Sequence, residues 1–326
     1  MTAFSTYDAN GNTLSDPSGK SYTWDFENRL VQAVVPGTNG GTTTFKYDPF
    51  GRRIYKQSPS FTSAFLYDGA DLLETVNGSG SEVASYTQGL GVDELLAMQR
   101  SGTADYFEAD GLGSITSLSG SAGALANTYT YDSFGNTTTS TGTVRNYFQY
   151  TAREFDPETT LYYYRSRYFD QTLGRFISED QSDEGSLYDA LNLYMYVQNN
   201  PANNVDPFGK YTLKPGVPPP SAAVAALLDC IEALSGVPLV VTSTSDSHSA
   251  TDPHTRGLAA DIRYPSDPAA VLNAAKCCGA QYAQDEKKHP SANATAPHIH
   301  VQLVPGKRGG HGDLPANAKC KDCSKD

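Results

Sequence analysis

A short unit that recurs along the first part of the chain constrains its fold more than any other feature. Tyr-Asp, two variable residues, Gly, and then Asn or Arg occupy residues 7–12, 47–52 and 131–136. Asp before a Gly-containing turn favours a tight reversal, since Gly adopts positive φ without steric cost. Because each repeat forms one supersecondary unit, the recurrence predicts an array of hairpins.

The segments around these turns alternate aromatic or β-branched residues with polar ones. Residues 22–26, 43–47, 64–67 and 129–131 show the pattern. A period of two places every second side chain on the same face of a strand. We therefore expect an all-β array in which tyrosines pack across neighbouring strands rather than serve as sugar-binding platforms.

Composition divides the chain near residue 210. The first part contains neither Cys nor His, whereas all cysteines and histidines lie after it. The cysteines are Cys230, Cys277, Cys278, Cys320 and Cys323. We expect two modules, the second in an oxidising location, because clustered cysteines in a small terminal module favour disulfides. Since five is an odd number, Cys320 and Cys323 form an alternative metal-binding pair.

The whole chain is acidic, with a formal net charge of −12. Such a protein has no broad basic surface to displace counterions from phosphates, so the charge predicts no nucleic acid partner. No stretch approaches the roughly 18 consecutive apolar residues needed to span a bilayer, so we expect no membrane span.

Longer motifs fill the second half of the first part. They are Gly111-Leu-Gly-Ser-Ile-Thr116, Tyr150-Thr-Ala-Arg-Glu-Phe-Asp156, Leu161-Tyr-Tyr-Tyr-Arg-Ser-Arg-Tyr-Phe-Asp170, Gly174-Arg-Phe-Ile-Ser-Glu-Asp180, Asn192-Leu-Tyr-Met-Tyr-Val-Gln-Asn-Asn-Pro201 and Asp206-Pro-Phe-Gly209. With the Tyr-Asp unit, they resemble the repeats and the repeat-associated core of Rhs and teneurin-type YD-repeat proteins. The resemblance implies a YD-repeat array over residues 1–105 and a repeat-associated core over 106–209. It further implies a hollow β-shell around a toxin that begins after Asp-Pro-x-Gly.

Two aspartates of these motifs are candidates for self-cleavage at the end of the core. By resemblance they are Asp180 and Asp206, and a carboxylate pair that shares a proton can act as acid and base on a nearby peptide bond. The sequence departs from the family pattern, because Gln181 and Lys210 follow the two motifs. The alternative is that both aspartates only stabilise turns of the shell.

The last part of the chain shows helix and strand patterns together. A segment rich in Pro and Gly at 210–220 is the expected linker, and residues 221–326 form the expected second domain. Helices are predicted over 221–236 and 267–278. Strands are predicted over 237–244, 257–264 and 298–304. These elements predict a small α+β domain with a mostly antiparallel sheet.

Histidines and one carboxylate indicate the chemistry of this domain. His254 and Asp261 lie seven residues apart, with Gly257 between them to let the chain turn. His298 and His300 lie on a predicted strand, where residues i and i+2 project from the same face. Two imidazoles and one carboxylate that leave a fourth position open have the ligand count of a catalytic zinc site. Carboxylate and imidazole also suit zinc better than metals that prefer thiolates.

The flanking sequence resembles a zinc peptidase superfamily. His-x-x-Gly-x-Ala-x-Asp-Ile at 254–262 and His-x-His at 298–300 resemble the motifs of D-alanyl-D-alanine carboxypeptidases, phage L-alanyl-D-glutamate endolysins and the Hedgehog domain. The resemblance implies that His254, Asp261 and His300 bind Zn²⁺ and that His298 acts beside the metal.

The proton-transfer group departs from that pattern. Many relatives place a carboxylate shortly before the last ligand, but residues 291–297 contain none. A zinc hydrolase still needs a group that takes and returns protons. Asp285 and Glu286, on the preceding predicted strand, are the candidates, with His298 acting alone as the alternative.

Three further residues are candidates for substrate binding. Arg256 and Arg263 are the nearest substitutes for the substrate-carboxylate arginine of the superfamily, and His248 matches a histidine found in some endolysins. His289 and His311 carry no such signal, so we expect them to be ordinary histidines.

The combined hypothesis is a multidomain chain, with an all-β YD-repeat shell segment followed by a small α+β zinc peptidase domain. It predicts the C-terminal part of a secreted or cell-surface bacterial toxin that acts in the target periplasm or cell wall. The predicted partners are peptidoglycan stem peptides and an immunity protein. Two alternatives are a non-catalytic zinc-binding recognition module on a YD-repeat surface protein and an adhesive β-array.

Overall fold

The structure is a computed structural model in which the chain forms two compact units. Unit 1 comprises residues 1–179 and 194–209, and unit 2 comprises residues 180–193 and 210–326. The described residues are 4–38, 40–89, 93–180, 192–210, 212–213, 217, 220–235, 237, 239–244, 253–254, 256–289, 297–305 and 312–315.

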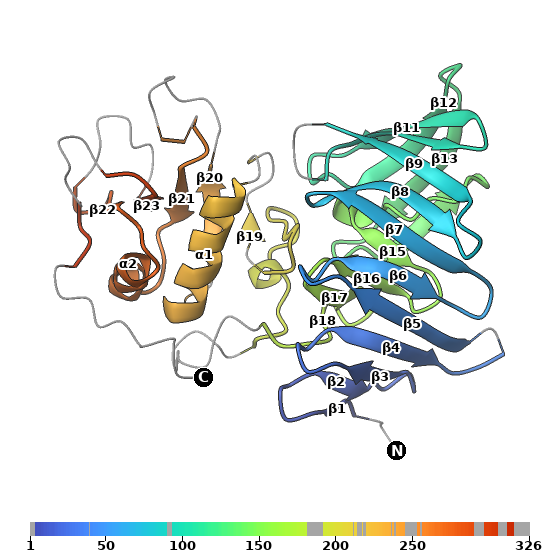
Figure 1. Ribbon diagram of the computed structural model, residues 1–326, viewed down its shortest axis with the longest axis horizontal. Coiled ribbons are helices and arrows are strands. Elements are labelled where there is room, and N and C mark those ends of the chain that lie inside the picture. The colour runs from blue at the N-terminus through green and yellow to red at the C-terminus, as the bar shows by residue number, and fades with distance from the viewer. Residues whose placement is uncertain are drawn as a thin grey trace. The chain divides into compact units, whose positions relative to one another are not determined.

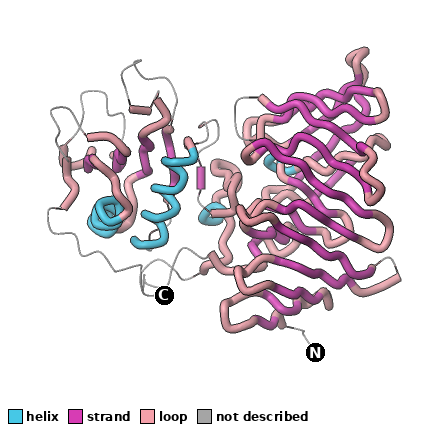
Figure 2. Tube along the Cα trace, viewed as in Figure 1, coloured by secondary structure: helices cyan, strands magenta, loops and turns pink. Residues whose placement is uncertain are grey.

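Unit 1 is built on one long sheet in which fourteen strands follow one another in chain order, each antiparallel to the next (Figure 1). The strands are β1 (Thr6–Tyr7), β2 (Thr13–Ser15), β3 (Ser21–Trp24), β4 (Leu30–Val35), β5 (Gly41–Tyr47), β6 (Arg53–Gln57), β7 (Thr62–Asp68), β8 (Asp71–Asn77), β9 (Glu82–Gln88), β10 (Leu95–Arg100), β11 (Thr103–Ala109), β12 (Ile115–Gly120), β13 (Leu125–Tyr131) and β14 (Thr137–Thr141). Figure 2 shows how strongly strands dominate this unit. The predicted array of hairpins is confirmed.

The recurring Tyr-Asp unit forms the tight turns of this sheet. In the turn that begins at Asp48, its Oδ1 accepts the backbone N–H groups of Phe50 and Arg52, both at 2.9 Å. Gly51 has a φ of 80°, as the sequence predicted, and Arg52 Nε donates to Asp48 Oδ2 at 2.7 Å. The Asp48 carboxylate therefore accepts hydrogen bonds from two backbone N–H groups of the turn and from the side chain of the residue after the glycine. These contacts explain the spacing of the unit.

In two of the three units, the tyrosine ties its turn to the preceding strand. Tyr47 Oη donates to the carbonyl of Leu30 at 2.7 Å, and Tyr131 Oη donates to the carbonyl of Ile115 at 2.7 Å. The tyrosines thus combine aromatic packing with a hydrogen bond from the hydroxyl, which is how buried tyrosines are usually satisfied.

A second, four-stranded sheet packs against the first. It consists of β15 (Glu154–Asp156), β16 (Leu161–Tyr164), β17 (Arg167–Asp170) and β18 (Arg175–Phe176), with two 3₁₀ turns, η1 (Tyr150–Ala152) and η2 (Val197–Asn199). Leu161, Tyr163 and Tyr168 of this sheet lie in one buried cluster with Leu30 and Phe45 of the long sheet. Residues 154–176 therefore form a second layer of unit 1, packed on the long sheet.

Buried charges join the two sheets of unit 1. Arg53 on β6 is 1% exposed and pairs with Glu154 (2.7 Å) and with Asp156, and Lys56 also pairs with Asp156 (2.7 Å). The Arg53 guanidinium lies 4.3 Å from the centre of the Tyr163 ring. Buried charges need such partners, because removal from water is costly.

Unit 2 is an α+β unit with a five-stranded sheet in the order β19-β20-β21-β23-β22. Its elements are β19 (Thr212–Leu213), α1 (Ala222–Ser235), β20 (Val240–Ser243), β21 (Ala259–Arg263), α2 (Pro268–Cys277), β22 (Tyr282–Asp285) and β23 (His298–Gln302). All pairings are antiparallel except β19 with β20. The predicted helices and strands are confirmed, and β19 lies within the segment predicted as a linker.

The helices begin where the sequence predicted. Asp267 Oδ1 accepts the N–H of Ala270 at 2.9 Å at the start of α2, and Pro268 occupies the first turn. The two helices pack against each other, and α2 also contacts β22, while Ile262, Ile299 and Val301 of the sheet are fully buried. Neither described helix has the length and hydrophobicity needed to cross a bilayer.

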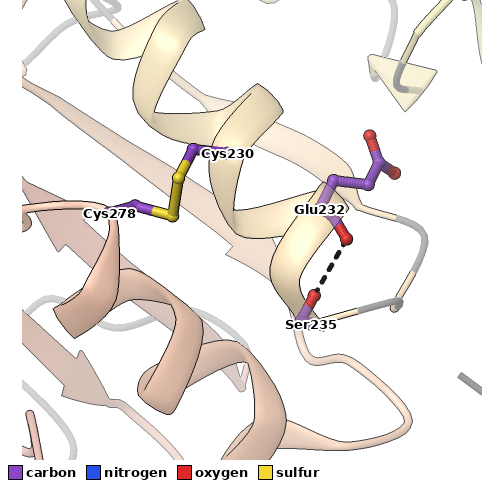
Figure 3. Close-up of a disulfide and its surroundings, with 4 residues drawn as sticks. All are labelled: Cys230, Glu232, Ser235 and Cys278. Carbon is purple, nitrogen blue, oxygen red and sulfur yellow. Dashed lines mark hydrogen bonds between the residues drawn. A yellow bond between two sulfur atoms is a disulfide. The ribbon is translucent and has the colours of Figure 1, made fainter. Parts of the chain in front are cut away.

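A disulfide links the two helices of unit 2 (Figure 3). Cys230 on α1 is bonded to Cys278, at the end of α2, across a sequence separation of 48 residues. Closing a loop of this length stabilises the folded state by about 4 kcal/mol in the chain-entropy model. Cys277 is also disulfide-bonded, so the expectation of disulfides is confirmed, whereas Cys320 and Cys323 lie outside the described residues.

Candidate metal centre

His254 enters the site from a tight turn before β21. The N–H of Gly257 donates to the His254 carbonyl at 2.8 Å, and Gly257 has a φ of 65°. The imidazole is 2% exposed, and its Nδ1 lies 2.8 Å from the backbone carbonyl of Thr244. A carbonyl only accepts hydrogen bonds, so Nδ1 carries a proton, and in the neutral ring Nε2 is the nitrogen that presents a lone pair to the site.

Asp261 and His300 are direct cross-strand neighbours on β21 and β23. Residues opposite each other in an antiparallel pair project from the same face. His300 Nδ1 accordingly lies 2.8 Å from Asp261 Oδ1. The pairing of β21 with β23 therefore places the imidazole of His300 against the carboxylate of Asp261.

The three predicted ligands converge on one point. His254 Nε2 lies 3.2 Å from Asp261 Oδ1 and 3.2 Å from His300 Nδ1. One ligand atom from each residue lies within 4.8 Å of the others, which makes the set a candidate metal site. Two imidazole nitrogens and one carboxylate oxygen match the donor set of a three-ligand zinc site.

The electrostatics of the site favour a negative carboxylate. Burial raises the pKa of Asp261, but hydrogen bonds and charge interactions with His254 and His300 outweigh it and hold the pKa well below its ordinary value. Asp261 is therefore ionised at neutral pH, as a carboxylate ligand must be.

The candidate proton-transfer residues separate onto the two faces of the sheet. His298 Nε2 lies 3.6 Å from Asp261 Oδ1, beside the ligands. Asp285 pairs with Ile299, on the face opposite His300, and hydrogen-bonds to Tyr264 Oη at 3.2 Å. The prediction of Asp285 as a base is wrong in position, because strand alternation turns its side chain away from the ligands.

Glu286 follows the opposite alternation. Its N–H donates to the carbonyl of His298 at 3.0 Å, which places its side chain on the face that carries His298 and His300. It is 7% exposed, and its charge contributes to the raised pKa of Tyr282 on the same face. Glu286 is therefore the carboxylate that the fold brings to the site's side of the sheet.

The predicted substrate-binding residues have different outcomes. Arg263 pairs with His298 across β21 and β23, so it extends the same face and is exposed. Arg256 is exposed in the turn after His254. His248 lies outside the described residues.

The two candidate self-cleavage aspartates belong to different units. Asp206, in unit 1, is 2% exposed, and its Oδ2 lies 3.3 Å from Arg167 Nη2. Asp180 belongs to unit 2, and its N–H donates to the carbonyl of Leu193 at 3.0 Å.

Two residues at the site were missed by the sequence analysis. Thr244 acts through its backbone carbonyl, for which no sequence signal exists. Gln302 Oε1 lies 2.9 Å from His300 Nε2. Its position two residues after His300 on a predicted strand was a usable signal, because i and i+2 share a face.

Comparison with known proteins covers mainly the first unit. The family model of the teneurin YD-shell matches residues 4–202. The tRNA3(Ser)-specific nuclease WapA of Bacillus spizizenii is 36% identical over 213 residues, which is 63% of this chain and 9% of the relative. The double-stranded DNA deaminase toxin A of Burkholderia cenocepacia is 27% identical over 248 residues, which is 64% of this chain and 17% of the relative.

A solved structure shows the same fold. The crystal structure of TcdB2-TccC3-Cdc42 matches 63% of this chain and 11% of its own, with a TM-score of 0.52 and 23% identity. The matched part of the chain thus spans only 9–17% of the length of these long proteins, and the family model ends before the candidate metal centre.

These comparisons correct two predictions. The zinc metallopeptidase that acts on peptidoglycan peptides is wrong, because the relatives are named for action on tRNA and DNA. The exclusion of a nucleic acid partner is wrong for the same reason.

The charge argument failed because it used the whole chain. Residues 1–209 contain 12 Lys and Arg against 25 Asp and Glu, whereas residues 210–326 contain 12 against 11, which gives −13 and +1. The acidity therefore belongs to the first part and says nothing about what the second part contacts.

Proposed function

Because the chain belongs to the teneurin YD-shell family, we propose that it is the C-terminal part of a toxin that acts outside the cell that makes it. Unit 1 is the shell segment, and unit 2 is the toxic effector. The effector works through a divalent cation, preferably zinc, held by His254, Asp261 and His300. The relatives' names make nucleic acid the first substrate class to test.

One observation carries the metal proposal. Thr244 orients the lone pair of His254 Nε2 toward Asp261, and His300 Nδ1 faces the same carboxylate oxygen. When both rings are neutral, as they must be to bind a metal, three electron-rich atoms lie 2.8–3.2 Å apart in a largely buried place. A divalent cation at this point would interact favourably with all three atoms at once.

The residues around the ligands suit a hydrolytic centre. When bound, zinc would lower the pKa of water towards ~7 and polarise a substrate oxygen. Glu286 and His298 share the face of the ligands, which makes them the candidates to take and return a proton. Exposed Arg263 on that face offers a cation to an anionic substrate.

The test begins with metal binding by the full chain. After removal of metal with a chelator, zinc is titrated back in competition with a chromogenic chelator. We expect one zinc ion per chain, with binding lost in His300→Ala and in Asp261→Asn. His289→Ala is the matched control, because that histidine is exposed and pairs with Asp313 instead. Equal zinc binding by wild type and His300→Ala would remove the proposal.

Activity is then measured on tRNA and on duplex DNA, comparing the zinc-loaded wild type with Glu286→Gln. Zinc-dependent turnover that falls at least tenfold in the variant supports a hydrolytic effector with Glu286 in proton transfer. Bound zinc without turnover on either substrate favours the alternative, a non-catalytic zinc-binding recognition module.

A further inference from the structure

Gln302 is a buried polar residue that contacts a predicted metal ligand. It lies on β23 two residues after His300, on the same face, and is 5% exposed. Its amide makes two described hydrogen bonds, one to the imidazole of His300 and one to the backbone of Val304.

The backbone contact fixes which way the amide points. Gln302 Nε2 donates to the carbonyl of Val304 at 2.8 Å. A carbonyl oxygen cannot donate, so the NH₂ group of the amide must face Val304. The amide oxygen then faces His300, with Oε1 2.9 Å from Nε2 of the ring.

The amide oxygen in turn fixes the tautomer of His300. Oε1 only accepts hydrogen bonds, so Nε2 of His300 carries a proton, and in the neutral ring that binds a metal Nδ1 is the nitrogen with the lone pair. That lone pair points to Asp261 Oδ1 at 2.8 Å, inside the site. The ring of Tyr282 packs edge-on against the imidazole, with centroids 6.1 Å apart, and limits its rotation.

We propose that Gln302 is a positioning residue that makes His300 bind the cation through Nδ1. The inference rests on the metal site proposed above. It makes the centre asymmetric, because His254 is held by the Thr244 carbonyl so that it binds through Nε2. The Thr244 carbonyl thus selects the ligand nitrogen of His254 directly. The Val304 carbonyl selects that of His300 through the Gln302 side chain.

Zinc affinity of the full chain tests the proposal. Gln302→Met keeps the volume and removes the acceptor, and we expect zinc to bind 10–100-fold more weakly, the usual cost of losing such a partner of a ligand histidine. Gln302→Glu keeps the acceptor, so its Kd should stay within about threefold of wild type. Gln284→Met is the control, because Gln284 flanks His300 on the other neighbouring strand.

Nuclear magnetic resonance of the ring nitrogens adds a readout that a merely structural role would not move. The metal-free wild type should show His300 with the proton on Nε2, assigned by comparison with His300→Ala. The preference should weaken in Gln302→Met and return in Gln302→Glu.

The outcomes separate the two proposals. No zinc binding by the wild type removes the metal site itself. Zinc binding by the wild type with an unchanged Kd and tautomer in Gln302→Met leaves the metal site standing and overturns the role of Gln302.

Discussion

Both units bury ionisable side chains, but the partners of these side chains differ. In unit 1, Arg53 faces Glu154 and Asp156, so positive and negative charges alternate. In unit 2, ring nitrogens of His254 and His300 lie against the carboxylate of Asp261. The first arrangement pairs each acid with a fixed cation of the protein, whereas the second is the one that we propose to bind a metal ion. Charges that compensate one another stabilise a fold, and three potential ligands around one point offer a binding site.

The largest effect should come from removing a buried positive charge from unit 1. Arg53→Met leaves Glu154 without its buried cation and Asp156 with Lys56 alone, and we expect the free energy of unfolding of unit 1 to fall by about 3–5 kcal/mol. Trp24 is the single tryptophan and lies on β3, so its fluorescence reports unit 1 alone. Arg29→Met is the control, because Arg29 pairs with Asp25 and Glu27 near the surface and should cost below about 1 kcal/mol. Similar losses in both variants would contradict the structural role of the buried cluster.

The next effect should come from adding zinc, which we propose to bind unit 2. At free zinc 100 times the Kd, binding to the folded state alone adds about 2.7 kcal/mol. We expect a calorimetric transition of wild type to move to higher temperature, while the Trp24 transition stays in place. Zinc should move nothing in Asp261→Asn. A shift of the Trp24 transition instead would show that zinc binds unit 1.

A smaller effect should distinguish a turn of unit 1 from the start of a helix in unit 2. Asp132→Ala removes the acceptor of the N–H groups of Phe134 and Asn136, and should cost unit 1 about 1–2 kcal/mol. Asp267→Ala removes one such bond at the start of α2 and should cost unit 2 about 1 kcal/mol. Urea unfolding followed by Trp24 fluorescence should detect the first change and not the second.

The smallest expected effect is a loss of stability of unit 1 at mildly acidic pH. Burial raises the pKa of Asp156, but Arg53 and Lys56 outweigh it and hold the pKa below the ordinary 3.8. A lowered folded pKa means that this stabilisation is present above about pH 4 and is lost as pH falls through the folded value. The urea concentration at the midpoint of unfolding, followed by Trp24 fluorescence, should therefore fall between pH 5 and pH 3. It should fall less in Asp156→Asn. Equal slopes for the two proteins would count against the ion pairs as the source.

The local structure was largely predictable from sequence because its causes are local. Asp48 and Gly51 lie within one turn, so their spacing alone predicted the reversal. The start of α2 at Asp267 and Pro268 was likewise set by neighbours in the chain. The convergence of Asp261 and His300 was predictable because strand alternation brings them to one face.

What the sequence determined by itself is thus the repeating hairpins, the helix ends and three residues able to bind a cation. Only the tertiary structure decided the rest. Register placed Glu286 on the face of the ligands and Asp285 on the other. Folding brought the Thr244 carbonyl to His254, and the four-stranded sheet brought Glu154 and Asp156 to Arg53 across about a hundred residues of chain. These contacts depend on distances through space, which spacing along the chain does not encode.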